Sequence, residues 1–112
     1  MHKSTDPITV SQPQKRRLTL GKGNKLALHL IAEGPGSDHF TYKWKKAGNG
    51  TLPDTTEGGN TQNLTIRSVM PTDGGSYYCT VMNPWGNMVE SNKTTVNVLC
   101  KLPQYWFVSI LL

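Results

Sequence analysis

Apolar and polar residues alternate with a period of two along much of the chain, which is the pattern of strands with one buried face. Leu26, Leu28 and Leu30 fall on one side of the stretch 26–32, and His29 falls on the other. Aromatic residues alternate with Thr and Lys in the same way over 40–45. Shorter runs that also predict strands are 8–10, 18–20, 64–66, 77–81, 88–89 and 95–98. We find no helical periodicity and no internal repeat.

Clusters of Gly, Pro, Asn and Asp separate these runs and predict turns. The stretch 46–63 is polar and rich in Gly, so it predicts a wide connection with at most one or two weak strands. The other turn clusters are 21–24, 33–38, 71–75 and 83–86. About seven short strands with turns between them predict an all-β sandwich or a small barrel.

Composition narrows the class of protein further. The 112 residues suit one domain, and 36% hydrophobic residues with three Trp and four Tyr exclude disorder. Two Cys residues exclude a disulfide-rich miniprotein. The net charge of +5 favours acidic partners without indicating nucleic acid.

Three segments are predicted along the chain. Residues 1–7 lack the apolar core of a secretory signal and are expected to be a disordered tail. Residues 8–99 are expected to form the domain. Residues 100–112 are an apolar C-terminal tail of unknown role, and its run 105–112 is less than half a membrane span. We expect this tail to pack on its own domain or on a neighbouring copy, which would give self-association.

The window 73–86 identifies the kind of sandwich. It resembles the D-x-G-x-Y-x-C-x-A-x-N-x-x-G pattern of immunoglobulin domains, with Val81 in place of Ala, and it looks like the intermediate, or I-set, branch. The resemblance implies a Greek-key β-sandwich of two antiparallel sheets, with Trp44 as the core tryptophan. It also implies that the hydroxyl of Tyr77 folds back to the backbone as a tyrosine corner. The six matching positions are Asp73, Gly75, Tyr77, Cys79, Asn83 and Gly86.

The chain departs from this pattern at one position. Leu30 stands where the family has the cysteine that bridges to Cys79, so we expect no intersheet disulfide. Cys100 lies too far along the last strand to substitute, because a bridge needs Cα atoms within about 7 Å. The predicted core residues are Leu28, Leu30, Trp44, Leu64, Ile66, Asp73, Tyr77 and Cys79.

No catalytic, metal-binding or cofactor-binding motif is recognisable, so we expect no enzyme and no cofactor. Trp85, beside Pro84 at a hairpin tip, is expected to be largely exposed and to contact a partner, or else to pack locally on Pro84 or a neighbouring loop. The basic residues form two groups, which are either solvated faces or sites for an acidic protein or a sulfated glycan. These groups are Lys15, Arg16 and Arg17, with Lys22 and Lys25 beside them, and Lys43, Lys45 and Lys46 on the outer face of one strand.

Three glycosylation sequons begin at Asn49, Asn63 and Asn92 and give mild support for secretion. The resemblance then implies a non-catalytic recognition or adhesion module of a cell-surface or secreted, receptor-like protein. Its partner would be a protein, which includes a second copy, and it would meet a membrane only through a parent protein. The alternatives are a cytoplasmic structural domain of a muscle-type scaffold and a heparin- or polyanion-binding receptor ectodomain. Nucleic acid is not an expected partner.

Overall fold

The computed structural model describes residues 8–12, 14–48 and 50–100, which form short strands and two 3-10 helices. Cys100 is exposed, whereas the predictions for 1–7 and for the rest of the C-terminal tail fall outside the described residues. The 3-10 helices are η1 (Ser37–His39) and η2 (Pro71–Asp73). The strands are β1 (Thr9–Ser11), β2 (Arg17–Gly21), β3 (Leu26–His29), β4 (Ile31–Glu33), β5 (Thr41–Lys46), β6 (Thr56–Glu57), β7 (Asn63–Ile66), β8 (Gly75–Met82), β9 (Met88–Glu90) and β10 (Thr94–Leu99).

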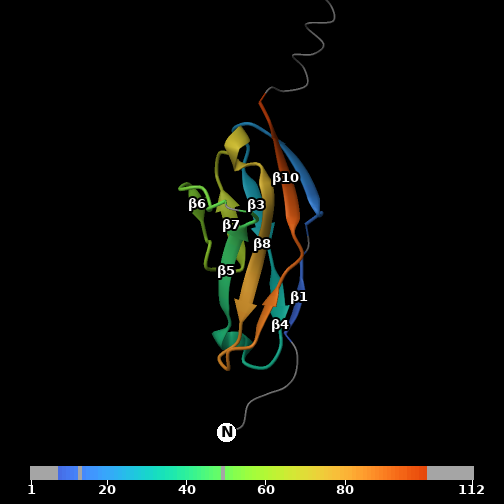
Figure 1. The fold of residues 1–112 in the computed structure, drawn as a ribbon, viewed down its shortest axis with the longest axis vertical. Coiled ribbons are helices and arrows are strands. Elements are labelled where there is room, and N and C mark those ends of the chain that lie inside the picture. The colour runs from blue at the N-terminus through green and yellow to red at the C-terminus, as the bar shows by residue number, and fades with distance from the viewer. Residues whose placement is uncertain (1–7, 13, 49, 101–112) are drawn as a thin grey trace, which may run out of the picture.

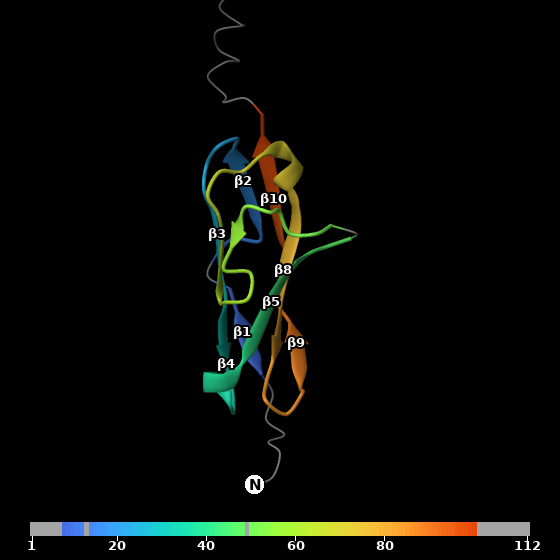
Figure 2. The ribbon, with the colours of Figure 1, turned by 90° about the vertical axis from the view of Figure 1, so that its left-hand side faces the viewer.

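The strands lie in two layers, which confirms the predicted sandwich (Figure 1). One layer is the sheet β2-β10-β8-β5, in which β9 also pairs with β8. The other layer contains β3-β7-β6 and, beyond Leu30, the β1-β4 pair. Figure 2 shows β3 and β4 on one side of the molecule and β5, β8 and β9 on the other. All ladders are antiparallel except β2–β10, which is parallel because the chain changes layers between β1 and β2.

The core lies between the two layers and follows the predicted alternation. The stretch from Leu26 to Ala32 buries every second side chain and exposes His29 and Ile31. Each fully buried large apolar side chain stabilises the fold by about 1.5–3 kcal/mol. The eight residues predicted for the core have exposures between 0% for Leu28 and 7% for Asp73. Trp44 and Cys79 are direct partners across the β5–β8 ladder, so the tryptophan packs beside the buried thiol.

No disulfide joins the layers in the described part of the chain, since Cys79 and Cys100 are both free. Hydrogen bonds from the strap, which we define as residues 58–62, connect the layers instead. The strap accepts Trp44 N–H at Gly59 O (2.9 Å) and the Trp44 indole N–H at Thr61 O (2.8 Å). Leu30 N–H donates to Gln62 O over 2.9 Å. The same short segment therefore holds both β5 and the end of β3.

The predicted tyrosine corner is present at the start of β8. The Tyr77 hydroxyl donates to the backbone carbonyl of Asp73, and the Asp73 carboxylate accepts Met70 N–H over 2.8 Å. Burial, followed by the nearby Asp73 carboxylate, raises the pKa of Tyr77 to about 12. The corner therefore fixes η2 against the inner face of β8 through a hydroxyl that stays protonated at neutral pH.

Candidate functional site

The outward-facing side of β5, β8 and β9 carries an unusual combination of methionine, lysine and threonine, and we call this side the outer face. Alternation along the three strands directs every second side chain away from the core. Register then places Met82 between Thr41 and Met88 in one row across the strands. The next row along the strands consists of Lys43, Thr80 and Glu90.

A hollow of about 530 Å³ opens on this face and reaches around the edge of β5. Met88 and Met82 are 59% and 38% exposed, although both lie on regular strands. Exposed, flexible methionines are typical of surfaces that adapt to an apolar partner group. The residues that line the hollow are Phe40, Thr41, Tyr42, Lys43, Lys45, Asn60, Thr80, Met82 and Met88.

Thr80 lies in the wall of this hollow and is 7% exposed. Its hydroxyl has no hydrogen-bond partner among the described residues. Buried polar groups are nearly always paired, because an unpaired one costs about 1–3 kcal/mol. Because the oxygen is buried as well as unpaired, it can reach a polar group in the hollow only if the side chains around it move.

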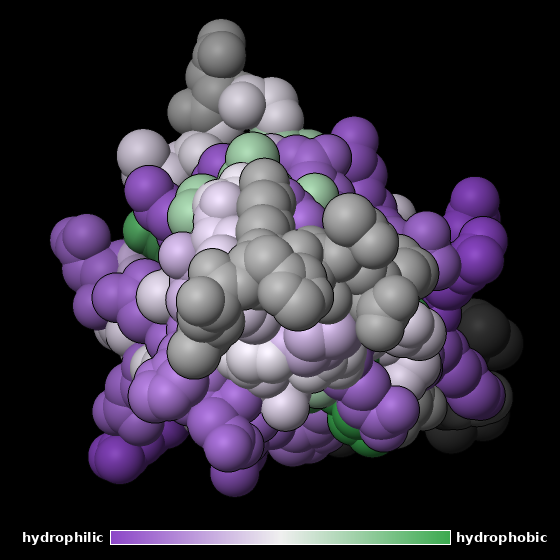
Figure 3. Space-filling view, turned by 90° about the horizontal axis from the view of Figure 1, so that it is seen from below, coloured by the Kyte–Doolittle hydropathy of each residue, from purple (hydrophilic) through white to green (hydrophobic). Residues whose placement is uncertain are grey.

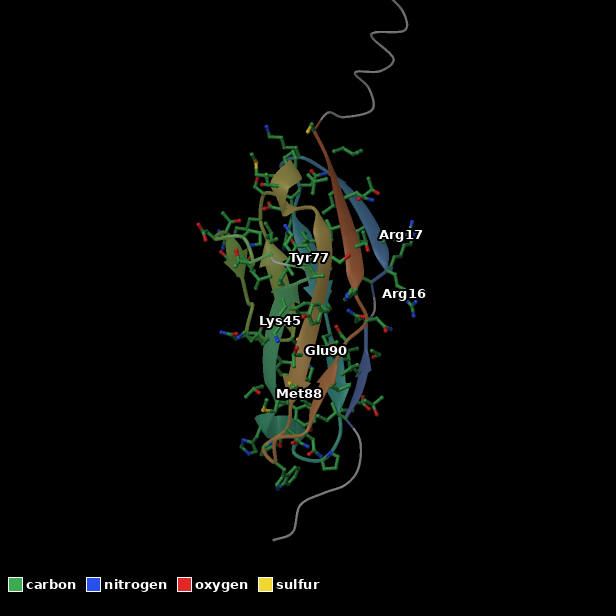
Figure 4. The ribbon with its side chains drawn as sticks, viewed as in Figure 1. Arg16, Arg17, Lys45, Tyr77, Met88 and Glu90 are labelled. Atoms are coloured by element: carbon green, nitrogen blue, oxygen red, sulfur yellow. The ribbon has the colours of Figure 1, made fainter. Side chains whose placement is uncertain are left out.

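Lys43 and Lys45 line the hollow on the β5 side. Both lie on the outward-facing side of β5, as the sequence predicted, and Figure 4 shows Lys45 there. Lys43 is exposed and Lys45 is half-buried. Glu90 lies across Thr80 from Lys43, but no ion pair forms on this face. Among the described residues the one ion pair joins Arg67 and Glu57, at 3.2 Å, in the other layer.

Lys46 does not lie on the outer face, which corrects the sequence prediction. It follows Trp44 on the inward-facing side of β5, and its ammonium donates to Thr72 O over 3.0 Å. The Nζ atom lies 5.9 Å from the centre of the Tyr77 ring, and the side chain passes over Gly75. The Lys46 ammonium is not buried, because β5 ends at this residue. Lys46 therefore covers the tyrosine corner and does not contribute to a binding surface.

Of the two alternatives for Trp85, the structure shows local packing against a neighbouring loop and not a largely exposed ring. Its side chain is half-buried, and the Trp85 ring and Pro84 lie against the side of Gly36 where a Cβ atom would be. The turn beneath them is fixed by the buried Asn83, whose Oδ1 accepts Trp85 N–H over 3.0 Å. Pro84 itself is exposed. Figure 3 views this end of the molecule and shows hydrophilic residues over most of its visible surface, with hydrophobic ones in small separate areas.

The other basic group lies on the opposite edge of the same sheet. Lys15, Arg16 and Arg17 are all exposed, and Arg17 begins β2. Figure 4 shows Arg16 and Arg17 projecting from the edge that is farthest from Lys45.

Two of the three sequons have exposed acceptors. Asn92 lies in the break between β9 and β10. Asn63 begins β7 in the other layer, and its Oδ1 is 2.7 Å from Nδ1 of His29. Asn49 lies outside the described residues.

The chemistry of the described residues provides few reactive groups. Burial raises the pKa of Cys79 to about 11, so its thiol stays protonated at neutral pH. Within 8–12, 14–48 and 50–100, no group of three or more His, Cys, Asp and Glu side chains could hold a metal ion. Over the same ranges, no helix is long and apolar enough to cross a membrane.

The sequence analysis did not identify Met82, Met88 or Thr80, which line the hollow together with the predicted Lys43 and Lys45. Met82 and Met88 lie on either side of the turn 83–87, at positions where the alternation of each strand predicts a solvent-facing polar side chain. An apolar residue at such a position on both strands was the sequence feature that could have identified them. Thr80 gave no signal, because its burial comes from neighbouring side chains and not from its own strand.

Comparisons with known proteins agree on the architecture. A family model described as "Immunoglobulin domain" matches residues 7–83. A solved structure described as "Tandem Ig repeats of Dlar" is similar to the chain with a TM-score of 0.64 and 18% identity. The match covers 82% of this chain and 49% of that one, so the chain spans about half the length of that structure. No curated protein matches the sequence.

Proposed function

Because the chain belongs to the immunoglobulin domain family, we propose that it is a protein-recognition or adhesion module of a cell-surface or secreted, receptor-like protein. The hollow on the outer face carries this proposal. Protein interfaces combine an apolar centre with a polar rim, and the exposed Met82 and Met88 beside Lys43 and Lys45 offer both. The unpartnered Thr80 hydroxyl adds one polar position to be satisfied by a partner.

We place the domain in the I-set branch. The segment between β5 and β7 contains only the two-residue β6 among its described residues. It thus leaves little room for the two extra strands of a variable domain. The six matching positions in 73–86 support the same assignment.

Binding of the full chain to intact cells tests the proposal. The biotinylated chain, tetramerised on streptavidin, should bind some cell lines saturably. Binding that remains after heparinase treatment of the cells should be lost on trypsin treatment, because the partner is a protein. Absence of saturable binding from a broad panel of lines, or complete loss of binding after heparinase treatment, contradicts the proposal.

The extracellular location has a test of its own. The exposed Asn63 and Asn92 support glycosylation. When the chain is expressed behind a secretory signal in eukaryotic cells, glycosidase treatment should lower its mass. Unchanged mass would favour the second candidate function, a cytoplasmic structural domain of a muscle-type scaffold. The observation that favours this alternative is the pair of free thiols, Cys79 and Cys100, which suits a reducing compartment.

A further inference from the structure

The register of the sheet brings Arg17 of one basic group onto the same face as Lys43 and Lys45 of the other. In β2, Leu18 and Leu20 pack against the core, so Arg17 and Thr19 point outward. In β5, the buried Trp44 points inward, so Lys43 and Lys45 point outward from the same sheet. Arg17 and Lys45 are distant in the sequence, yet they lie on the same side of one layer.

A third cation lies between these two. Arg17 on β2 is paired with Thr95 on β10, and Thr95 with Ser76 on β8, so two strands lie between Arg17 and β5. Lys45 is paired with Tyr78, and the Nζ atom of Lys93 lies 5.8 Å from the centre of the Tyr78 ring. With about 4.8 Å between strands, the cations cross about 14 Å of sheet. We call Arg17, Lys93, Lys45 and Lys43 the basic track.

Little opposes the positive charge of this track. Glu90 is the only carboxylate among the outward-facing residues that the structure describes on β2, β5, β8, β9 and β10. None of the four cations takes part in an ion pair with another described residue. Lys15 and Arg16 are exposed beside the Arg17 end and extend the charge past the edge of the sheet.

We propose that the basic track, which shares Lys43 and Lys45 with the rim of the hollow, binds an extended sulfated polysaccharide. Between Arg17 and Lys93 the surface is polar, because the hydroxyls of Ser76 and Thr95 lie 3.2 Å apart, so this part of the track lacks the desolvated core of a protein interface. A second copy of the chain docked on the track would place its own lysines against these lysines, and the like charges would repel. Nucleic acid stacks its bases on exposed aromatic faces, whereas Lys93 covers the ring of Tyr78.

Two matched double variants of the full chain test this site. Arg17→Ala with Lys93→Ala removes two track cations that do not line the hollow, and Lys22→Ala with Lys25→Ala removes two exposed cations from the turn after β2. Each pair lowers the net charge from +5 by two, to +3. Non-specific electrostatic attraction therefore falls equally in both.

Heparin is the probe, and its affinity is measured by calorimetry at several salt concentrations. The track variant should bind heparin about tenfold more weakly at 0.15 M salt, and the slope of log affinity against log salt should fall by about 2. The turn variant should stay within about twofold of the unmodified chain. Equal weakening in both variants, or no binding to heparin at 0.15 M salt, overturns the proposal.

Further measurements separate the competing explanations. Polyglutamate or single-stranded DNA that binds more tightly than heparin would overturn the assignment to a sulfated polysaccharide. Arg17→Gln with Lys93→Gln, checked by its melting temperature, replaces the alanine pair if that pair does not fold. The track variant should keep the cell binding that resists heparinase, so the glycan site and the proposed protein site can fail separately.

Discussion

Leu30 is the core residue whose substitution is most informative, because it lies where related domains have a cysteine opposite Cys79. It is 2% exposed, and Cys79 is fully buried. Leu30→Cys should form a bridge to Cys79 in oxidising buffer and raise the melting temperature. Closing a loop of about 50 residues is worth about 4 kcal/mol, against about 1.5–3 kcal/mol of lost leucine burial.

The reduced form of Leu30→Cys is the control, and it should melt below the unmodified chain. Free-thiol titration reports whether the bridge has formed. The bridged variant should keep one of its three thiols, that of Cys100, whereas a variant that keeps all three in oxidising buffer would show that residue 30 does not face Cys79.

Tyr77 gives the fold a defined response to alkaline pH. Burial raises its pKa from 10.0 to about 12, so the unfolded chain loses the phenol proton first. Its contribution is therefore complete below pH 10 and is lost as pH rises toward 12. Tyr77→Phe should be about 1 kcal/mol less stable at pH 7, since the hydroxyl no longer reaches Asp73 O.

Urea unfolding between pH 8 and pH 11 measures this response. The unfolding free energies of the unmodified chain and of Tyr77→Phe should converge above pH 10. The buried Cys79, whose pKa is raised from 9.0 to about 11, contributes to alkaline destabilisation in both. Curves that stay parallel over the whole range would contradict the role given to Tyr77.

The β8–β9 turn is held to the η1 loop by a contact that only glycine permits. Gly36 has a φ of +78°, and a Cβ atom there would lie 2.9 Å from Pro84 Cδ and 3.0 Å from Trp85 Cζ3. Gly23 has a similar φ of +91° but open space around it. Gly36→Ala should therefore lose about 1 kcal/mol more stability than Gly23→Ala, which introduces only backbone strain.

Chemical denaturation of both alanine variants measures this difference. Equal losses at the two positions would show that the Trp85 ring does not pack on Gly36.

A strand was predictable from the sequence wherever one of its faces packs on the core and the other faces solvent, because its apolar and polar residues then alternate. Alternation located β3, β5 and β8, and the motif around Cys79 located the turn 83–87. The break in the ladders at Leu30 was not predictable, because it arises where β1 replaces β7 as the hydrogen-bonding partner. Lys46 and Trp85 were misplaced for a related reason, since their positions depend on Thr72 and Gly36 in distant loops.

The two outward-facing sheet surfaces of the molecule differ in the side chains that they carry. The outer face of β5, β8 and β9 has the hollow, its methionines and its lysines, whereas the outward side of β3 and β7 includes His29 and the sequon acceptor Asn63. A sequence gives the residues of each strand but not their neighbours across the sheet. The grouping of Met82 with Met88, and of Arg17 with Lys93, therefore required the structure.

The central claim is that the outer face recognises a protein partner, and a matched pair of substitutions tests it. Met88 is 59% exposed on that face, and Ile31 is 49% exposed on β4 in the other layer. Each is replaced by Asp in the full chain, and binding of the tetramerised variants to heparinase-treated cells is measured. Met88→Asp should weaken binding about tenfold or more, and Ile31→Asp should leave it unchanged. Unaltered binding by Met88→Asp, or equal losses in both variants, would contradict the account.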